Sequence, residues 1–168
     1  MAFLNIKGPV LANTCYKDGE LVAKDVTLTL PTVTYKTAEH NAMGTIELPM
    51  LGQIDAMEAS VTKKGYDSGL AKLARPEAMD LEFRFVQQRI EADNSSKEEG
   101  CKVFMRAVPK TLPGSDLEPG SVGDTQITFS VTRYQLFVDG EEICLIDQLK
   151  GIQKINGTDY AKTINSLL

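Results

Sequence analysis

The stretch Thr125–Tyr160 constrains the fold of this chain more than any other. Its first residues alternate apolar and hydroxyl-bearing side chains: Ile127, Phe129 and Val131 against Thr128, Ser130 and Thr132. A repeat of two residues is the period of a β-strand with one buried face. The pattern therefore predicts an amphipathic strand, and none of these side chains resembles a catalytic group.

The alternation changes phase in the middle of this strand. Apolar residues stand at odd positions up to Val131 and at even positions from Tyr134 onward. A single extra residue produces such a change, so we predict a β-bulge near Arg133. Asp139-Gly140 then provides two residues that tolerate positive φ, which a tight type I′ hairpin turn requires.

A return strand and a short tail follow the predicted hairpin. Ile143 and Leu145 are assigned to the apolar face of the return strand, which leaves Cys144 on the polar face. Asn156-Gly157 predicts a second tight turn. The tail after it has apolar residues at helical spacing, which predicts a helical turn.

The rest of the chain predicts a mainly β protein with little helix. Other alternating runs occur at 26–30, 57–61 and 81–85, and a short helix is expected from Tyr66 to Leu73, capped by Asp67 or Ser68. We predict about eight strands arranged as a two-sheet β-sandwich or barrel, with the helix packed on the outside.

The predicted organisation is one domain over residues 1–168, a length that can bury its own core. The segments without a clear pattern are expected to be irregular. They are an extended N-terminal segment (1–19), a loop at 37–45, long polar loops at 91–100 and 109–124, and a C-terminal tail (156–168).

The composition argues against several functional classes. The chain carries a formal charge of -5, which argues against sequence-independent nucleic-acid binding through basic patches. The N-terminus has no charged region followed by an apolar core, which argues against a signal peptide. No apolar run approaches the roughly 20 residues that span a bilayer.

Histidine and cysteine, which often act in catalysis or bind metals, are few in this chain. His40 is the only histidine and has no neighbouring nucleophile motif. Cys15, Cys101 and Cys144 are far apart, which suits a reducing compartment better than a disulfide framework. The glycine-rich segment before Thr125 lacks the Gly-Lys-Ser/Thr ending of a phosphate loop. We therefore predict no catalytic site, no metal site and no cofactor.

Short hydroxyl side chains gather at the outward positions of two predicted strands. They are Thr27, Thr29, Thr128, Ser130 and Thr132. Threonine is common on exposed strand faces, so ordinary polar cover is one interpretation. The other is that these residues face a water-filled lumen enclosed by several subunits. The sequence leaves both open.

The C-terminal region also carries a more specific pattern. An aromatic strand leads to an Asp-Gly hairpin, an aliphatic strand ending in Ile-Asp, and an apolar-Lys-apolar-Asn-Gly turn. The residues are Tyr134, Leu136, Asp139, Gly140, Ile146, Asp147, Lys154, Asn156 and Gly157. This order resembles the closing segment of the major tail tube proteins of contractile-tailed phages. Weaker similarities lie at 22–31, Gly44, 83–85 and 105–106, so the resemblance spans nearly the whole chain.

The resemblance implies a structural protein that forms hexameric rings around a β-barrel lumen. The rings would stack into the inner tube of a phage tail or a tail-like bacteriocin particle, related to the tube of type VI secretion. The implied partners are further copies of the chain, the tail sheath protein, baseplate or tube-initiator and tail terminator proteins, and a tape measure protein inside the tube. In a phage, DNA would pass without specific binding, because an acidic lumen repels phosphate. Assembly is expected in the bacterial cytoplasm.

The alternative from another class is a monomeric β-sandwich that binds a ligand. Such a module needs an exposed aromatic platform. The chain has no Trp and only five Tyr, which offers little material for one.

Overall fold

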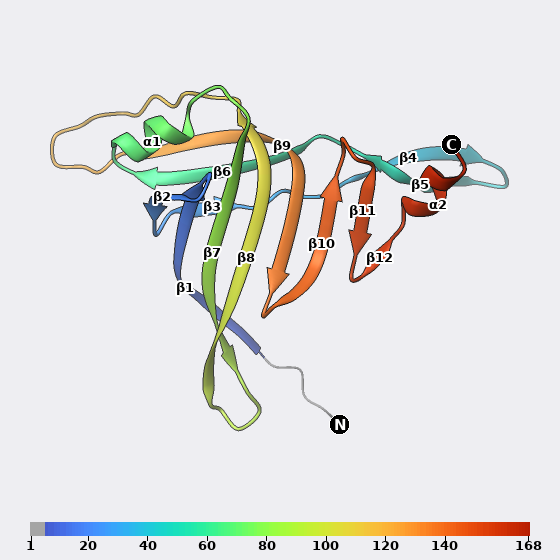
Figure 1. The fold of residues 1–168 in the computed structure, drawn as a ribbon, viewed down its shortest axis with the longest axis horizontal. Coiled ribbons are helices and arrows are strands. Elements are labelled where there is room, and N and C mark those ends of the chain that lie inside the picture. Colours follow the sequence, from blue (N-terminus) through green and yellow to red (C-terminus); the bar gives the residue numbers. More distant parts are fainter. Residues whose placement is uncertain (1–5) are drawn as a thin grey trace.

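The computed structural model describes residues 6–168, which are folded mainly as β-strands (Figure 1). The strands are β1 (Ile6–Lys17), β2 (Glu20–Lys24), β3 (Thr27–Thr29), β4 (Tyr35–Asn41), β5 (Thr45–Ile54), β6 (Met57–Lys64), β7 (Met79–Ile90), β8 (Ser96–Pro109), β9 (Asp124–Val138), β10 (Glu141–Asp147), β11 (Ile152–Ile155) and β12 (Thr158–Asp159). The helices within this range are α1 (Ser68–Leu73) and α2 (Lys162–Ser166). The predicted mainly β fold with short helices is confirmed.

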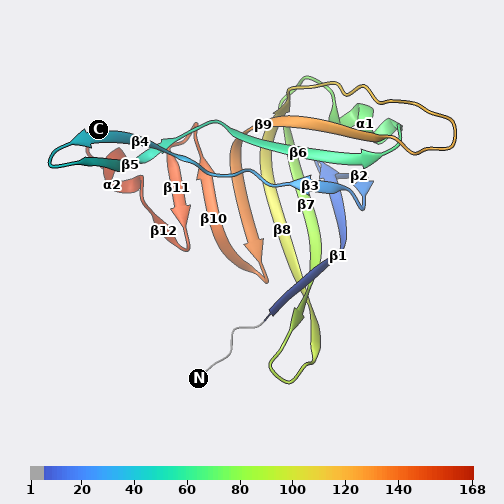
Figure 2. The ribbon, with the colours of Figure 1, turned by 180° about the vertical axis from the view of Figure 1, so that it is seen from behind.

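Antiparallel hydrogen bonding joins most of the strands into one curved sheet. Its order is β12-β11-β10-β9-β8-β7-β1-β2, and β6 and β3 branch from β9. The strands β4 and β5 form a separate hairpin. Figures 1 and 2 show β3, β6 and the first half of β9 crossing over the layer formed by the other strands.

Strand β9 bends and so belongs to both layers. Its residues up to Val131 pair with β6, and its residues from Arg133 onward pair with β10. Against β8, Val131 lies opposite Ala107 and Arg133 lies opposite Arg106, so Thr132 is the extra residue. The predicted bulge is confirmed, one residue before Arg133. It turns the strand because an inserted residue bends and twists the backbone.

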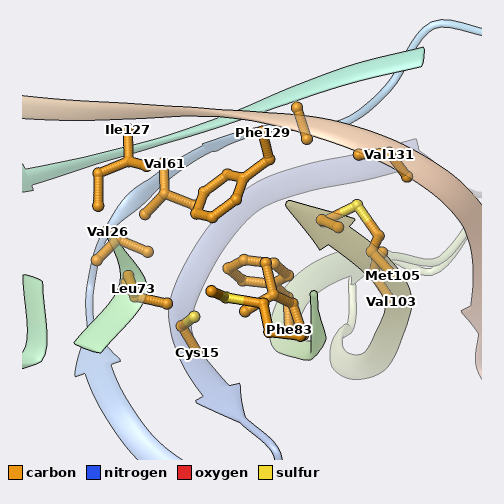
Figure 3. Close-up of a cluster of buried hydrophobic side chains, with 14 of the residues drawn as sticks. Cys15, Val26, Val61, Leu73, Phe83, Val103, Met105, Ile127, Phe129 and Val131 are labelled. Atoms are coloured by element: carbon orange, nitrogen blue, oxygen red, sulfur yellow. The ribbon is translucent and has the colours of Figure 1, made fainter. Parts of the chain in front are cut away.

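The hydrophobic core lies between the two layers (Figure 3). Ile127 and Phe129 of β9 and Val61 of β6 point toward Phe83 of β7 and Leu73 of α1. These five side chains are at most 2% exposed. Burial of the inward positions of β6, β7 and β9 explains why these strands alternate so clearly in the sequence.

Of the two predicted caps of α1, Asp67 is the one that the structure shows, and Ser68 is the first helical residue. Asp67 Oδ1 accepts a hydrogen bond of 3.0 Å from the Leu70 amide, which satisfies one free donor of the first turn. Leu70 and Leu73 are buried against the core. Tyr66 was expected on the same face, but it precedes the helix and is 54% exposed. Its hydroxyl instead donates to the Pro113 carbonyl.

The tight turns form where the sequence places them. Asp139 and Gly140 have φ of 50° and 81°, and Asn156 and Gly157 have φ of 46° and 85°. Both pairs therefore have the positive values of a type I′ turn. Asp18-Gly19, also at positive φ, forms the turn that joins β1 to β2.

Two segments expected to be irregular are strands. Residues 6–17 form β1, whose pairing with β7 shifts register on both sides of Val10. Residues 37–45 belong to the β4–β5 hairpin instead of a loop. Alternation appears in a sequence only when one strand face is buried, and nearly every residue of this hairpin is exposed. Residues 1–5 of the predicted extended segment lie outside the described range.

The predicted polar loops are also shorter than expected. Only 91–95 connect β7 to β8, because residues 96–100 already belong to β8. Between β8 and β9, residues 110–123 are irregular, close to the predicted 109–124. The segment 156–168 contains β12 and α2.

The prediction for Cys144 was wrong. Glu142 pairs with Phe137 and Cys144 pairs with Leu136, so Ile143 is an extra residue in β10. This second bulge reverses the alternation of the return strand. Cys144 therefore packs against the core, while Ile143 is 38% exposed.

Candidate functional site

Four of the five predicted hydroxyl residues lie on the outer side of the layer formed by β3, β6 and β9. The cross-strand rows are Thr27–Thr62, Thr29–Ser60–Thr128 and Glu58–Ser130. We call Thr27, Thr29, Ser60, Thr62, Thr128 and Ser130 the hydroxyl face. The inward neighbours of these residues fill the core, so the backbone fixes which way the face points.

The fifth predicted residue, Thr132, occupies a different setting. It is the bulge residue of β9, and its hydroxyl donates to the Arg106 carbonyl at 3.4 Å. Its side chain therefore helps to satisfy the backbone where the strand bends. That role could not be assigned before the register of β8 against β9 was known.

The hydroxyl face offers hydrogen bonds but little charge. Gln126 Nε2 donates to Ser60 Oγ at 3.2 Å, and Lys110 Nζ lies 3.0 Å from Glu58 Oε2 at one end of the face. A serine or threonine hydroxyl is a weak nucleophile unless a neighbouring base or a metal ion activates it. The single histidine, His40, lies on the separate β4–β5 hairpin. This arrangement suits a wetted surface more than a reaction centre.

The opposite layer presents a charged surface that the sequence analysis did not identify. Arg106 pairs with Asp80 at 3.0 Å, and Arg84 pairs with Glu82 at 2.6 Å. The Arg84 guanidinium also stacks over the ring of Tyr16, 4.6 Å from its centroid. Asp80 and Arg106 come from β7 and β8, so only the strand register brings them together.

The thiols and acids of the described chain form no reactive cluster. Burial raises the pKa of the Cys15 thiol to about 12, although Lys63 acts in the opposite direction. Cys101 and Cys144 are also free thiols whose pKa burial raises. Within residues 6–168, no group of three or more His, Cys, Asp and Glu side chains is placed to hold a metal ion. No helix of that range is long and apolar enough to span a membrane.

The β4–β5 hairpin extends from the body of the molecule (Figures 1 and 2). Ile46 and Leu48 lie on one of its faces and are 52% and 51% exposed. At its base the Gly52 amide donates to Gln153 Oε1 at 2.8 Å, which fixes the hairpin to β11. Within residues 6–168, β4 is the only strand that pairs with β5. Exposed apolar side chains on a strand with such a free edge are typical of a surface that contacts another chain.

Comparison with known proteins identifies the family of the chain. A family model described as phage tail tube protein FII matches residues 10–168. The chain belongs to this tail tube family. It is 27% identical over 143 residues to the tail tube protein of Escherichia phage P2. The aligned region covers 82% of this chain and 81% of the phage P2 protein.

Solved structures agree with the family in fold. One similar chain comes from the sheath–tube complex of an extracellular contractile injection system, PVC. The TM-score is 0.56 and the sequence identity is 16%, and the match covers 77% of this chain and 90% of the PVC chain. Another comes from the tube terminating cap of the anti-feeding prophage, with a TM-score of 0.55 and 14% identity over 82% and 95%. At these identities the likeness concerns the fold alone.

Family membership confirms the tail tube resemblance found in the C-terminal motif. Members of this family are structural proteins, so the tail tube chain is a structural subunit and not an enzyme. The sequence motif that carried the resemblance spans β9 to β11, the hairpin and turn that close the larger layer.

Proposed function

We propose that this tail tube protein assembles into hexameric rings that stack as the inner tube of a contractile phage tail or a tail-like particle. The observation that carries the proposal is the match of the tail tube family model to residues 10–168, which include all but the first residues of the described fold. Identical subunits can build a ring or a tube when each one contacts its neighbours through the same pair of surfaces.

The free edges and exposed apolar side chains support assembly. Strand β1 pairs with β2 only from Thr14 onward, so the first half of its outer edge carries no neighbour within residues 6–168. The hairpin carries Ile46, Leu48 and Leu51 at exposures between 51% and 53%. A soluble monomer normally protects such edges, whereas a ring can close them against identical neighbours.

We propose that the hydroxyl face and Thr132 line the lumen. Short neutral hydroxyl groups keep a wall hydrated without binding a passing chain strongly. The formal charge of -5 would further discourage DNA phosphates from adhering in a phage tube.

The remaining partners belong to the same proposal. Sheath, baseplate or initiator, and terminator proteins would contact the outside and ends of the tube, and a tape measure protein would occupy its lumen during assembly. Two of the chains with a similar fold come from a sheath–tube complex and from a tube terminating cap. They support the sheath and terminator proteins as partners. Each subunit would contribute one domain and would assemble in the bacterial cytoplasm.

Electron microscopy of the purified full-length protein tests the assembly. Negative staining at several salt and protein concentrations should show rings of about six-fold symmetry or long tubes. A protein that stays monomeric under all conditions in light scattering would contradict the proposal and favour a monomeric ligand-binding module.

A further inference from the structure

An apolar groove interrupts the charged outer surface of β7, β8 and β9. Phe104 and Phe137 form its wall, with ring centroids 5.9 Å apart and planes at 89°. Val86 completes it and is 36% exposed. Gly100 leaves the floor bare, because a Cβ atom there would meet no heavy atom within 4 Å. The groove has a volume of about 480 Å³.

The rim of this groove carries an unbalanced positive charge. Arg84 and Lys102 line it and lie directly opposite each other on β7 and β8. Like charges at opposed positions destabilise a strand pair. Glu82 compensates Arg84, whereas Lys102 has no ion pair with any residue in the range 6–168 and its side chain is exposed. A carboxylate from another chain would relieve the repulsion.

The loop between β8 and β9 offers a matching projection. Leu117 is 82% exposed and stands between Asp116 and Glu118. The ends of the loop are fixed, since the Lys110 amide donates to the Thr128 carbonyl at 2.7 Å and the Gly65 amide donates to the Gly123 carbonyl at 2.9 Å. The loop therefore presents an apolar side chain between two acids at a defined end of the molecule.

The loop and the groove of one subunit are far apart. Figures 1 and 2 both show the loop projecting beyond α1, whereas the end of β9 and the start of β8, where Phe137 and Gly100 lie, are at the opposite end of these strands. The loop of one subunit therefore cannot reach the groove of the same subunit, but it can reach that of another molecule.

We propose that Leu117 of one subunit inserts into the groove of a second copy of this chain, with Asp116 and Glu118 facing Lys102 and Arg84. Insertion buries an exposed leucine against two phenylalanines, and the acids neutralise the excess positive charge of the rim. This contact rests on the proposed assembly into tubes, and it identifies two of the surfaces that meet there.

Disulfide trapping in assembled tubes tests the contact directly. A variant with Leu117→Cys and Val86→Cys should form covalent dimers and longer ladders on a non-reducing gel after mild oxidation. Leu112 is the matched control, because it is 78% exposed on the same loop but has no acidic neighbour. The pair Leu112→Cys and Val86→Cys, and each single variant, should cross-link several-fold less. Equal cross-linking of the two pairs would overturn the proposal.

Charge reversal provides a second test that needs no new thiol. Lys102→Glu should raise the protein concentration needed for tube formation about tenfold. Glu118→Lys should raise this concentration by a similar factor. The double variant should recover most of the loss, since the opposite charges meet again. Lys24→Glu, on an exposed residue of β2, is the control and should assemble normally.

The two tests separate this contact from the proposed function. If the unmodified protein forms no rings or tubes, the proposed function fails. If tubes form but neither the Leu117 pair nor the charge reversal differs from its control, the tube assignment stands and the loop–groove contact is wrong.

Discussion

Asp67 illustrates how one side chain positions the helix beneath the core. Its carboxylate caps α1 through the Leu70 amide and also pairs with Lys63. Replacing it with alanine removes both bonds, and loss of a helix cap costs about 1 kcal/mol. We expect Asp67→Ala to lower the free energy of unfolding by about that amount in urea titrations. Asp67→Asn keeps an N-cap acceptor and should lose clearly less.

The same residue makes part of the stability depend on pH. The bonds from Lys63 and then from the Leu70 amide hold the pKa of Asp67 below its ordinary value of 3.8. A depressed carboxyl pKa adds stability that is complete above the unfolded value and disappears as pH falls through the folded value. The advantage of the wild type over Asp67→Asn should therefore be constant from pH 5 to 7 and shrink below about pH 4. An advantage that grows in acid would contradict the assignment.

At the scale of elements, α1 approaches β2 so closely that only glycine fits at one position. A Cβ atom on Gly69 would lie 2.3 Å from the Val22 carbonyl oxygen. Alanine normally stabilises a helix by about 1 kcal/mol relative to glycine. Here we expect the reverse, because the helix must move off the sheet. Gly69→Ala should lower Tm by several degrees in thermal denaturation, which corresponds to roughly 1–3 kcal/mol of overpacking.

Ala71 provides the control for this close contact. It lies on the exposed side of the same helix, so Ala71→Gly should show only the usual propensity cost of about 1 kcal/mol. A Gly69→Ala protein that is more stable than the wild type would show that α1 can move away from Val22 without loss.

The sequence predicted the strands that bury every second side chain along their length. It missed the β4–β5 hairpin, which has no buried face, and β1, which buries side chains only near its C-terminal end. The alternation in β7 and β9 arises from Phe83 and Phe129, and the phase change before Tyr134 indicates the bulge. The β4–β5 hairpin has no buried face and is held by backbone hydrogen bonds, so its residues carry no alternating signal. The bulge at Ile143 also escaped detection, because the apolar run from Ile143 to Ile146 fits either phase of a strand.

The sequence also predicted one of the two surfaces described above and missed the other. Thr29 and Thr128 belong to separate predicted strands, and β6 brings them into one row through Ser60. The hydroxyl face could be predicted because strand period fixes which residues point outward. The opposition of Arg84 and Lys102 could not, since it depends on the register between β7 and β8.

At the scale of the whole molecule, the hydroxyl face has a direct test of its orientation. A thiol introduced by Thr128→Cys would be half-exposed in the free subunit, as Thr128 is. In a long tube it would lie inside the lumen if the proposal is correct. We expect a bulky maleimide polymer to label this thiol many-fold more slowly in tubes than in dissociated subunits, because the reagent must enter from the tube ends.

The native thiols and the tube itself require controls in that experiment. The unmodified protein reports the background from Cys15, Cys101 and Cys144, two of which are buried. Ala92→Cys, at the exposed turn between β7 and β8, reports the access of the reagent to a site outside the hydroxyl face. Slow labelling confined to Thr128→Cys would assign β3, β6 and β9 to the lumen. Equal rates in tubes and free subunits would place this face on the outside, where its hydroxyl groups are ordinary polar cover.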